Sequence, residues 1–218
     1  EARPASSAFS LTHAKYALID DRRALILTHN SSSEELATRR DVALADDDPA
    51  HVAFVRSLFE ADWNRTALGK IPPGFVVSPE NSNQQLTGLV DTATRSLDIY
   101  AEKLLPSPLL DHIVAAAERG VKVRILAAPL DPKDRVAEQL RAAIQRGQLQ
   151  IHILRRPRVH AKLILVDGAS VFLGSENVQD APKEKRRELG VIFRDDALAG
   201  QFARLFEGDW AAPSDPSR

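Results

Sequence analysis

The chain has 218 residues, of which 44% are hydrophobic and 27% charged, and its formal net charge at pH 7 is −1. This near-neutral balance argues against a dedicated nucleic-acid binder, which usually carries a strong basic excess. The chain contains no cysteine, which excludes disulfide bonds and thiolate metal sites, and no apolar run approaches the roughly 20 residues of a membrane span.

The N-terminal segment 1–63 is predicted to form three strands followed by one helix. Short runs rich in Leu, Ile and Val are typical of buried strands, and they occur at residues 15–20, 23–28 and 41–45. A helix is expected from Pro49 to Trp63, with Asp48 as its N-cap and the proline in its first turn.

The segment from 74 to 154 alternates between predicted strands and predicted helices. Strands are expected at residues 74–78, 97–102, 121–129 and 148–154, and helices at 81–96, 107–120 and 131–147. Ser107 is the expected N-cap of the second helix, with Pro108 at its first position and Gly120 at its C-terminal end. Such alternation predicts an α/β layer architecture in which helices cover a sheet.

Residues 160–210 repeat residues 13–63 without a gap. At an offset of 147 residues, 15 of the 51 aligned positions are identical, and His13 falls on His160. The second copy therefore predicts the elements of the first, with strands at 162–167, 170–175 and 188–193 and a helix at 196–210. A match this ordered, at polar and apolar positions alike, predicts an internal duplication.

The duplication predicts two lobes, of which the first is incomplete. The second unit fills 147 residues but only 63 precede it, so about 84 residues are expected upstream of residue 1. The expected organisation is the end of a first lobe at 1–63, a linker at 64–73, a second lobe at 74–210 and a tail at 211–218. An N-terminal fragment of the same protein is thus an expected partner. The alternative is a short protein with a degenerate first half.

Each copy offers an imidazole, an ammonium group two residues later and an amide seventeen residues after the histidine. Residues i and i+2 of a strand share one face, so each histidine lies beside its lysine. Two copies around an approximate two-fold axis would gather these groups at one point, which suits the oxygens of a phosphate. One imidazole could then attack as a nucleophile while the other protonates the leaving oxygen.

These residues resemble the phospholipase D superfamily, in particular a bacterial phospholipase D-like protein. The resemblance lies in His-x-Lys-x4-Asp at 13–20 and 160–167, in GSEN at 174–177 and in RRELGV at 186–191. It implies an α/β fold of two pseudo-symmetric α/β/α sandwich lobes with the site between them. It also implies hydrolysis or transfer at a phosphodiester through a covalent phosphohistidine, with no metal and no other cofactor.

The resemblance implies a role for each repeated type of side chain in the two copies. His13 would be the nucleophile, while His160 would protonate the leaving alcohol and later activate water. Asp41 and Glu188 match the acidic position that orients the motif histidines. The candidate catalytic set also contains Lys15 and Lys162 and, as structural supports, Asp20 and Asp167.

The same resemblance implies a set of groups that hold the substrate phosphate. These are Lys15, Lys162, Asn30, Asn177, Thr28 and Ser175. The first copy departs from the family pattern, because LTHN stands at 27–30 where the second copy has GSEN. Its acidic residue, Asp41, is also one methylene shorter than Glu188 of the second copy. The assignment of the nucleophile is therefore left open between the two histidines.

Three functions are compatible with these motifs. The first is a phosphodiesterase of phospholipase D type that acts on phospholipids, with peripheral contact at a membrane surface. The second is a metal-independent nuclease or nucleic-acid phosphodiesterase, against which the 6% aromatic content counts because stacking platforms are few. The third is a catalytically silent phosphate-binding scaffold, against which the intact motifs count. Secreted, periplasmic and cytoplasmic locations all stay open.

Two basic stretches and one acid lie near the second motif in the sequence. RRPR at 155–158 runs into His160, and KEKRR at 183–187 precedes Glu188. They are either solvated loops or a positive rim that attracts an anionic substrate. Glu102 follows a predicted strand and is expected at the mouth of the site.

Overall fold

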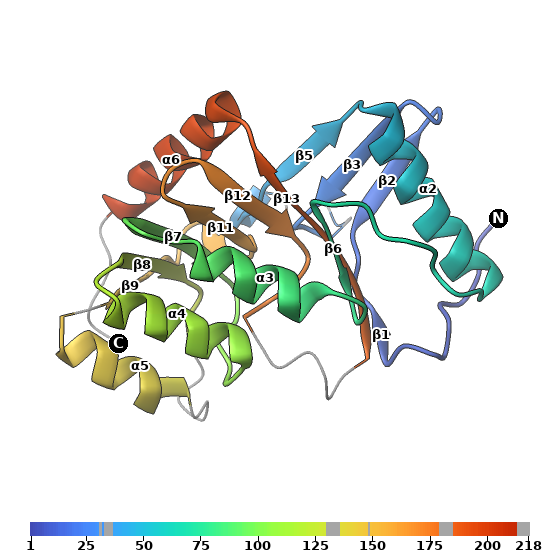
Figure 1. Ribbon diagram of the computed structural model, residues 1–218. Coiled ribbons are helices and arrows are strands. Elements are labelled where there is room, and N and C mark those ends of the chain that lie inside the picture. The colour runs from blue at the N-terminus through green and yellow to red at the C-terminus, as the bar shows by residue number, and fades with distance from the viewer. Residues whose placement is uncertain (31, 33–36, 130–135, 148, 179–184, 213–218) are drawn as a thin grey trace.

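A mixed sheet of eight strands forms the centre of the computed structural model, which describes residues 1–30, 32, 37–129, 136–147, 149–178 and 185–212 (Figure 1). The predicted tail beyond residue 212 lies outside the described residues. The strand order is β1 (Leu11–Thr12), β13 (Arg186–Arg194), β12 (Ser170–Gly174), β11 (Leu163–Val166), β7 (Ser96–Ala101), β8 (Lys122–Ala127) and β9 (Leu149–Ile153), and β6 (Phe75–Ser78) also pairs with β13.

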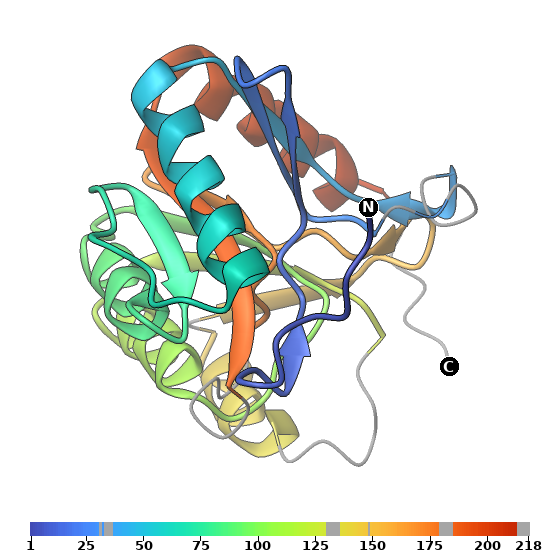
Figure 2. The same cartoon turned by 90° about the vertical axis from the view of Figure 1, so that its right-hand side faces the viewer.

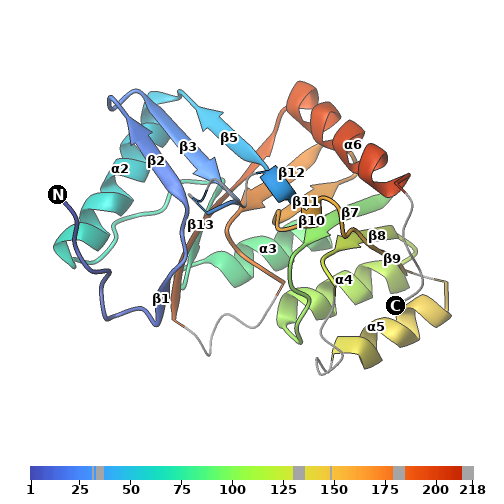
Figure 3. The same cartoon turned by 180° about the vertical axis from the view of Figure 1, so that it is seen from behind.

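Two smaller sheets are built largely from the N-terminal segment 1–63. One is antiparallel, in the order β2 (Tyr16–Ile19), β3 (Arg23–Leu27) and β5 (Ala43–Asp46). The other is a short parallel pair of β4 (Arg39–Arg40) and β10 (Arg158–Val159), seen from behind in Figure 3. In the described part of the chain, β2 pairs with β3 alone, whereas its counterpart β11 lies between β12 and β7.

Helices cover these sheets in the described part of the chain. They are α2 (Pro49–Asn64), α3 (Ser82–Asp91), α4 (Pro108–Glu118), α5 (Val136–Gln145) and α6 (Asp196–Trp210). Helices α3, α4 and α5 lie on one face of the large sheet, and α2 lies along the small sheet of β2, β3 and β5 (Figures 1 and 2). No helix in the described ranges is both long enough and apolar enough to cross a bilayer.

Side chains of β7 alternate between two hydrophobic cores, as the pleat of a strand requires. Leu97 and Ile99 are buried in the core under α3 and α4, while Tyr100 is buried on the opposite face. The core on that opposite face also contains buried residues of β3, α2 and α6. The N-terminal segment 1–63 is therefore packed onto the large sheet through a shared core.

The mixed α/β architecture confirms the predicted fold class, and each predicted strand and helix has a counterpart among the described residues. Residues 131–135 of the predicted helix 131–147 and residue 148 of the following strand lie outside the described residues. Helix α3 ends at Asp91, earlier than the expected end at 96. The cause is the carboxylate of Asp167, which binds the backbone N–H groups of Thr94, Arg95 and Ser96 and holds them out of a helix. The sequence did not predict β1, β4 and β10, whose partners are distant in the chain. The two-lobe organisation stays a prediction.

The two short parallel pairings are equivalent under the internal repeat. Leu11 pairs with Arg186 in the β1–β13 ladder, and Arg158 pairs with Arg39 in the β10–β4 ladder. Residues 11 and 158 occupy equivalent repeat positions, as do residues 39 and 186. The segment before each motif histidine thus pairs with the segment before the acidic residue of the other copy.

Gly174 lies where β12 and β13 approach most closely around the motif. A Cβ atom at this position would lie 2.5 Å from the Cα of Gly190 and 2.7 Å from the carbonyl oxygen of Leu189. We expect Gly174→Ala to lower the free energy of unfolding by about 1–3 kcal/mol, because backbone atoms of β13 must move. Urea denaturation followed by circular dichroism measures the change.

The matched control for this prediction is Gly88→Ala in α3, where nothing lies within 4 Å of the added Cβ. This substitution should leave stability unchanged or raise it by up to about 1 kcal/mol, because alanine is the better helix former. Equal unfolding free energies for the two variants would contradict the close approach of β12 and β13.

Candidate active site

His13 follows β1 and is held by a carboxylate of the second copy. Its backbone N–H donates to the carbonyl oxygen of Arg187 at 2.8 Å, and its Nδ1 lies 2.9 Å from Oε2 of Glu188. Because an ionised carboxylate only accepts hydrogen bonds, Nδ1 carries the proton. Nε2 of the neutral ring then keeps its lone pair, so it can act as a nucleophile or as a base.

His160 is held in the same way by the first copy. Its backbone N–H donates to the carbonyl oxygen of Arg40 at 3.0 Å, and its Nδ1 lies 2.8 Å from Oδ1 of Asp41. The side chains of this histidine and this aspartate are only 4% and 6% exposed. Each acidic residue therefore contacts the histidine of the other copy, which the repeat alone did not reveal.

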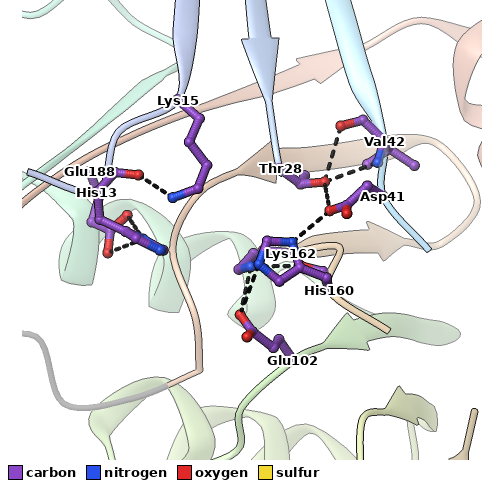
Figure 4. A network of polar contacts seen from close by, with 9 residues as sticks. All are labelled: His13, Lys15, Thr28, Asp41, Val42, Glu102, His160, Lys162 and Glu188. Atoms are coloured by element: carbon purple, nitrogen blue, oxygen red, sulfur yellow. Dashed lines mark hydrogen bonds and ion pairs between the residues drawn. The ribbon is translucent and has the colours of Figure 1, made fainter. Parts of the chain in front are cut away.

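Lys15 and Lys162 reach into the space between the two histidine–carboxylate pairs (Figure 4). Each Nζ donates a hydrogen bond of 2.6 Å to the carbonyl oxygen of its own motif histidine. Burial lowers the pKa of Lys15 to about 8, and the nearby ammonium of Lys162 adds to this effect, against the pull of Glu188. Burial also lowers the pKa of Lys162, whose side chain is 2% exposed.

Glu102, directly after β7, brings a third carboxylate to the site. Its Oε2 lies 2.7 Å from Nζ of Lys162 and 3.7 Å from Nε2 of His160. Burial raises the pKa of Glu102, but the charges of Lys162 and His160 outweigh burial and lower it overall. The repeat could not identify this residue, because the two matching segments, 13–63 and 160–210, do not include it.

Two arginines next to the acidic residues are anchored inside the protein. Arg40 pairs with Asp209 at 2.6 Å and Arg187 with Asp62 at 3.1 Å, and these two ion pairs occupy equivalent repeat positions. The side chain of Arg187 is 3% exposed, so the expected positive rim does not include it. The sequence contained a signal for these two ion pairs, because both arginines and both aspartates are identical in the two repeat copies.

The two motif hydroxyls, which were expected to hold the phosphate, are fully buried. Oγ1 of Thr28 donates to Oδ1 of Asp41 at 2.7 Å and accepts from the backbone N–H of Val42 at 2.9 Å. Oγ of Ser175 accepts from the backbone N–H of Leu189 at 3.1 Å. Both hydroxyls therefore brace the segments that carry the acidic residues, and neither is exposed to a ligand.

The two motif asparagines differ in their surroundings. Asn177 is buried and lines a small cavity with Glu176 and Glu188, and its Oδ1 has no hydrogen-bond partner within the described residues. Burial, reinforced by the charge of Glu188, raises the pKa of Glu176 well above its usual value. Asn30 is half-buried directly beyond β3. Contact of either asparagine with a phosphate stays a prediction.

Asp20 and Asp167 lie at the opposite ends of β2 and β11 from the motif histidines. The carboxylate of Asp167 accepts hydrogen bonds from the backbone N–H groups of Arg95 and Ser96 at 2.7 and 2.9 Å and from the hydroxyl of Thr94 at 2.7 Å. Burial opposes them, but these bonds lower the pKa of Asp167 to about 2. Asp20 is exposed in a left-handed turn with φ of 51°. Both positions suit support of a turn.

The structure brings two imidazoles, each held by a carboxylate, and two lysines into one region (Figure 4). Two ammonium groups can neutralise the oxygens of a phosphate, and two Nε2 atoms are left for chemistry because both Nδ1 atoms are held by carboxylates. Among the described residues, no three His, Asp or Glu side chains converge as a metal site would require.

Sequence comparison relates the chain to known proteins over most of its length. A family model described as "Cardiolipin synthase, PLD-like domain" matches residues 86–210. The 5'-3' exonuclease PLD3 of Rattus norvegicus is 28% identical over 180 residues, which cover 75% of this chain and 35% of the exonuclease. The phospholipase D of Rickettsia bellii is 26% identical over 125 residues, which cover 57% of this chain and 61% of the relative. The chain thus spans only part of the length of each curated relative.

Structure comparison gives related folds. The phospholipase D family member NUC from Salmonella typhimurium has a TM-score of 0.51 and 25% identity, covering 62% of this chain and 91% of its own. The phosphatidylserine synthase of Haemophilus influenzae has a TM-score of 0.68 and covers 95% of this chain and 63% of its own. Because the synthase is only 16% identical to this chain, its similarity shows a shared fold and nothing about function.

The low pKa of Lys15 predicts how anion binding depends on pH. Only the ammonium form attracts an anion, so affinity for sulfate, which stays doubly charged throughout, should fall about tenfold between pH 7 and pH 9 as Lys15 loses its proton. Isothermal titration calorimetry over this range measures the affinity.

Lys15→Arg is the matched variant, because a guanidinium keeps its charge at pH 9. Its absolute affinity can differ from that of the wild type, but the decline above pH 8 should be largely removed. A decline of the same size in both proteins would assign it to another group, such as the histidines.

Proposed function

Because the chain belongs to the phospholipase D superfamily, we propose that it is a phosphodiesterase that works through a covalent phosphohistidine. One observation carries this proposal. His13 and His160 each have Nδ1 bound to a carboxylate of the other copy, which leaves both Nε2 atoms for a substrate held between them. The two lysines beside them supply the positive charge that a phosphodiester needs.

In the proposed first step, Nε2 of His13 attacks the phosphorus atom. A P–N bond forms as the P–O bond to the leaving alcohol breaks, and the proton on Nε2 of His160 passes to the leaving oxygen. In the second step, His160 takes a proton from water, the water oxygen attacks phosphorus, and the P–N bond breaks. An alcohol in place of water would give transfer instead of hydrolysis.

The position of Glu102 supports giving the acid role to the second histidine. Its carboxylate lies beside Nε2 of His160, the atom that would carry the proton. Within the described residues, no carboxylate lies at salt-bridge distance from Nζ of Lys15, whereas Nζ of Lys162 pairs with Glu102. The lysine of the first copy therefore has less negative charge beside it than the lysine of the second. The two chemically equal histidines thus lie in unequal surroundings, which is what opposite protonation roles require.

For the substrate, we favour a phospholipid, from which the enzyme would release the headgroup alcohol or transfer the phosphatidyl group. The description of the matching family and the rickettsial phospholipase D support this choice, as do the net charge of −1 and the few aromatic residues. The second candidate is nucleic acid. It is favoured by the rat exonuclease, whose match extends over 75% of this chain.

The catalytic part of the proposal predicts turnover without metal. Bis(4-nitrophenyl) phosphate should be hydrolysed with EDTA present, and His13→Ala should lower kcat on the order of a thousandfold or more, because no nucleophile remains. His160→Ala should also slow hydrolysis of this substrate, because His160 takes a proton from water in the second step. The loss should be larger for a substrate that releases choline, because nitrophenolate needs protonation by His160 least.

Near-full activity of His13→Ala alongside an inactive His160→Ala would reverse the two roles. Complete loss of wild-type activity in EDTA would contradict the metal-independent reaction. The control is His112→Ala, whose ring pairs with Asp91 on the surface and should keep wild-type activity.

A second measurement separates the two substrate classes. We expect release of choline from short-chain phosphatidylcholine to exceed hydrolysis of single-stranded and double-stranded DNA at equal phosphodiester concentration. Headgroup release is followed by a coupled choline assay, and DNA cleavage by gel electrophoresis. Cleavage of DNA with no activity on the lipid would replace the first substrate with the second.

A further inference from the structure

We propose that Glu102 sets the charge specificity of the anion pocket, so that the site favours singly charged phosphodiesters over doubly charged phosphomonoesters. The inference rests on the proposed phosphodiester site and deepens it. Its basis is that the carboxylate stands where an oxygen of the substrate phosphate has to be.

The contacts of Glu102 are those that a phosphate oxygen needs. To be held by Lys162, a phosphate oxygen must lie within about 3 Å of its Nζ, and to lie at the acid His160 it must come close to Nε2. Oε2 of Glu102 lies 2.7 Å from that Nζ and 3.7 Å from that Nε2. Figure 4 shows this carboxylate beside Lys162 and His160, so a phosphate would compete with it for one position.

Burial explains why Lys162 needs this carboxylate. Its side chain is 2% exposed, and an ammonium group withdrawn from water requires a nearby negative charge to stay protonated. Glu102 provides the strongest attraction that opposes this burial. The ion pair thus favours the ammonium form of Lys162 in the free site, and a bound phosphate supplies the same negative charge when it takes the place of the carboxylate.

A bound phosphate must displace Glu102 from Lys162 without removing it from the site. The residue directly follows β7, and its side chain is 21% exposed, so it can turn toward water but stays at the mouth of the pocket. A carboxylate there repels the ligand in proportion to the ligand's negative charge. A phosphodiester carries one charge, whereas a phosphomonoester carries close to two at neutral pH.

This charge dependence has a consequence for turnover. Hydrolysis of a phosphodiester converts a singly charged substrate into a doubly charged phosphomonoester in the same pocket. Repulsion by Glu102 is therefore greater for the product than for the substrate, and it favours release of the product.

The test compares dimethyl phosphate with methyl phosphate, which differ by one methyl group and one charge. Their affinities for the full chain are measured by isothermal titration calorimetry at pH 7.5. Glu102→Gln should raise the affinity for dimethyl phosphate on the order of tenfold and the affinity for methyl phosphate on the order of a hundredfold. The reason is that the substitution removes a repulsion that is twice as large for a doubly charged ligand. The preference for the diester should thus fall on the order of tenfold.

Two variants serve as controls. Glu118→Gln removes a carboxylate at the end of α4 that is paired with Arg146, and it should leave both affinities unchanged. Glu102→Asp keeps the negative charge and should keep the preference of the wild type for dimethyl phosphate. If Glu102→Gln does not fold by circular dichroism, Glu102→Ala removes the same charge and should show the same loss of preference.

An unchanged preference in the Gln or Ala variant would overturn the inference. Weaker binding of both ligands would also overturn it, because Glu102 would then act only by positioning Lys162. Absence of binding by every variant would reject the pocket as an anion site. Binding with the expected preference, together with no hydrolysis of any diester, would reject the proposed function and leave the charge specificity standing.

Discussion

The hydrogen bond from each motif histidine to a carboxylate of the other repeat copy is the constraint around which the structure is arranged. Glu188 reaches His13 because β1 pairs with β13, and Asp41 reaches His160 because β10 pairs with β4. These carboxylates fix the protons on Nδ1 and so leave Nε2 for chemistry. Neither copy alone contains both partners of either hydrogen bond.

Ion pairs between the two copies hold each acidic residue next to the histidine of the other copy. Arg40 and Arg187 each precede an acidic residue of the site, and each is bound to an aspartate on the helix that ends the other copy. Buried pairs of this kind contribute little net stability, because desolvation offsets much of the attraction. Their value here is geometric, since they fix the register in which each acid meets its histidine.

The two halves of the site are alike in residue type but unequal in charge. Lys162 is almost fully buried and paired with Glu102, whereas Lys15 is more exposed and has a pKa of about 8. A nucleophile and a proton donor of the same residue type need such unequal surroundings. The proposed roles of the two histidines and the inferred charge specificity at Glu102 both rest on this asymmetry.

Local signals in the sequence were enough to locate the helices and the longer strands, the caps at Asp48 and Ser107, and the repeated histidines, lysines and acids. Periodicity, capping and motif spacing act over a few residues, so they can be read along the chain. Which acid serves which histidine could not be read in this way, because the partners lie 175 and 119 residues apart. The burial of Thr28 and Ser175 and the contact of Glu102 with Lys162 likewise depend on how the sheets pack, and only long-range packing brings these groups together.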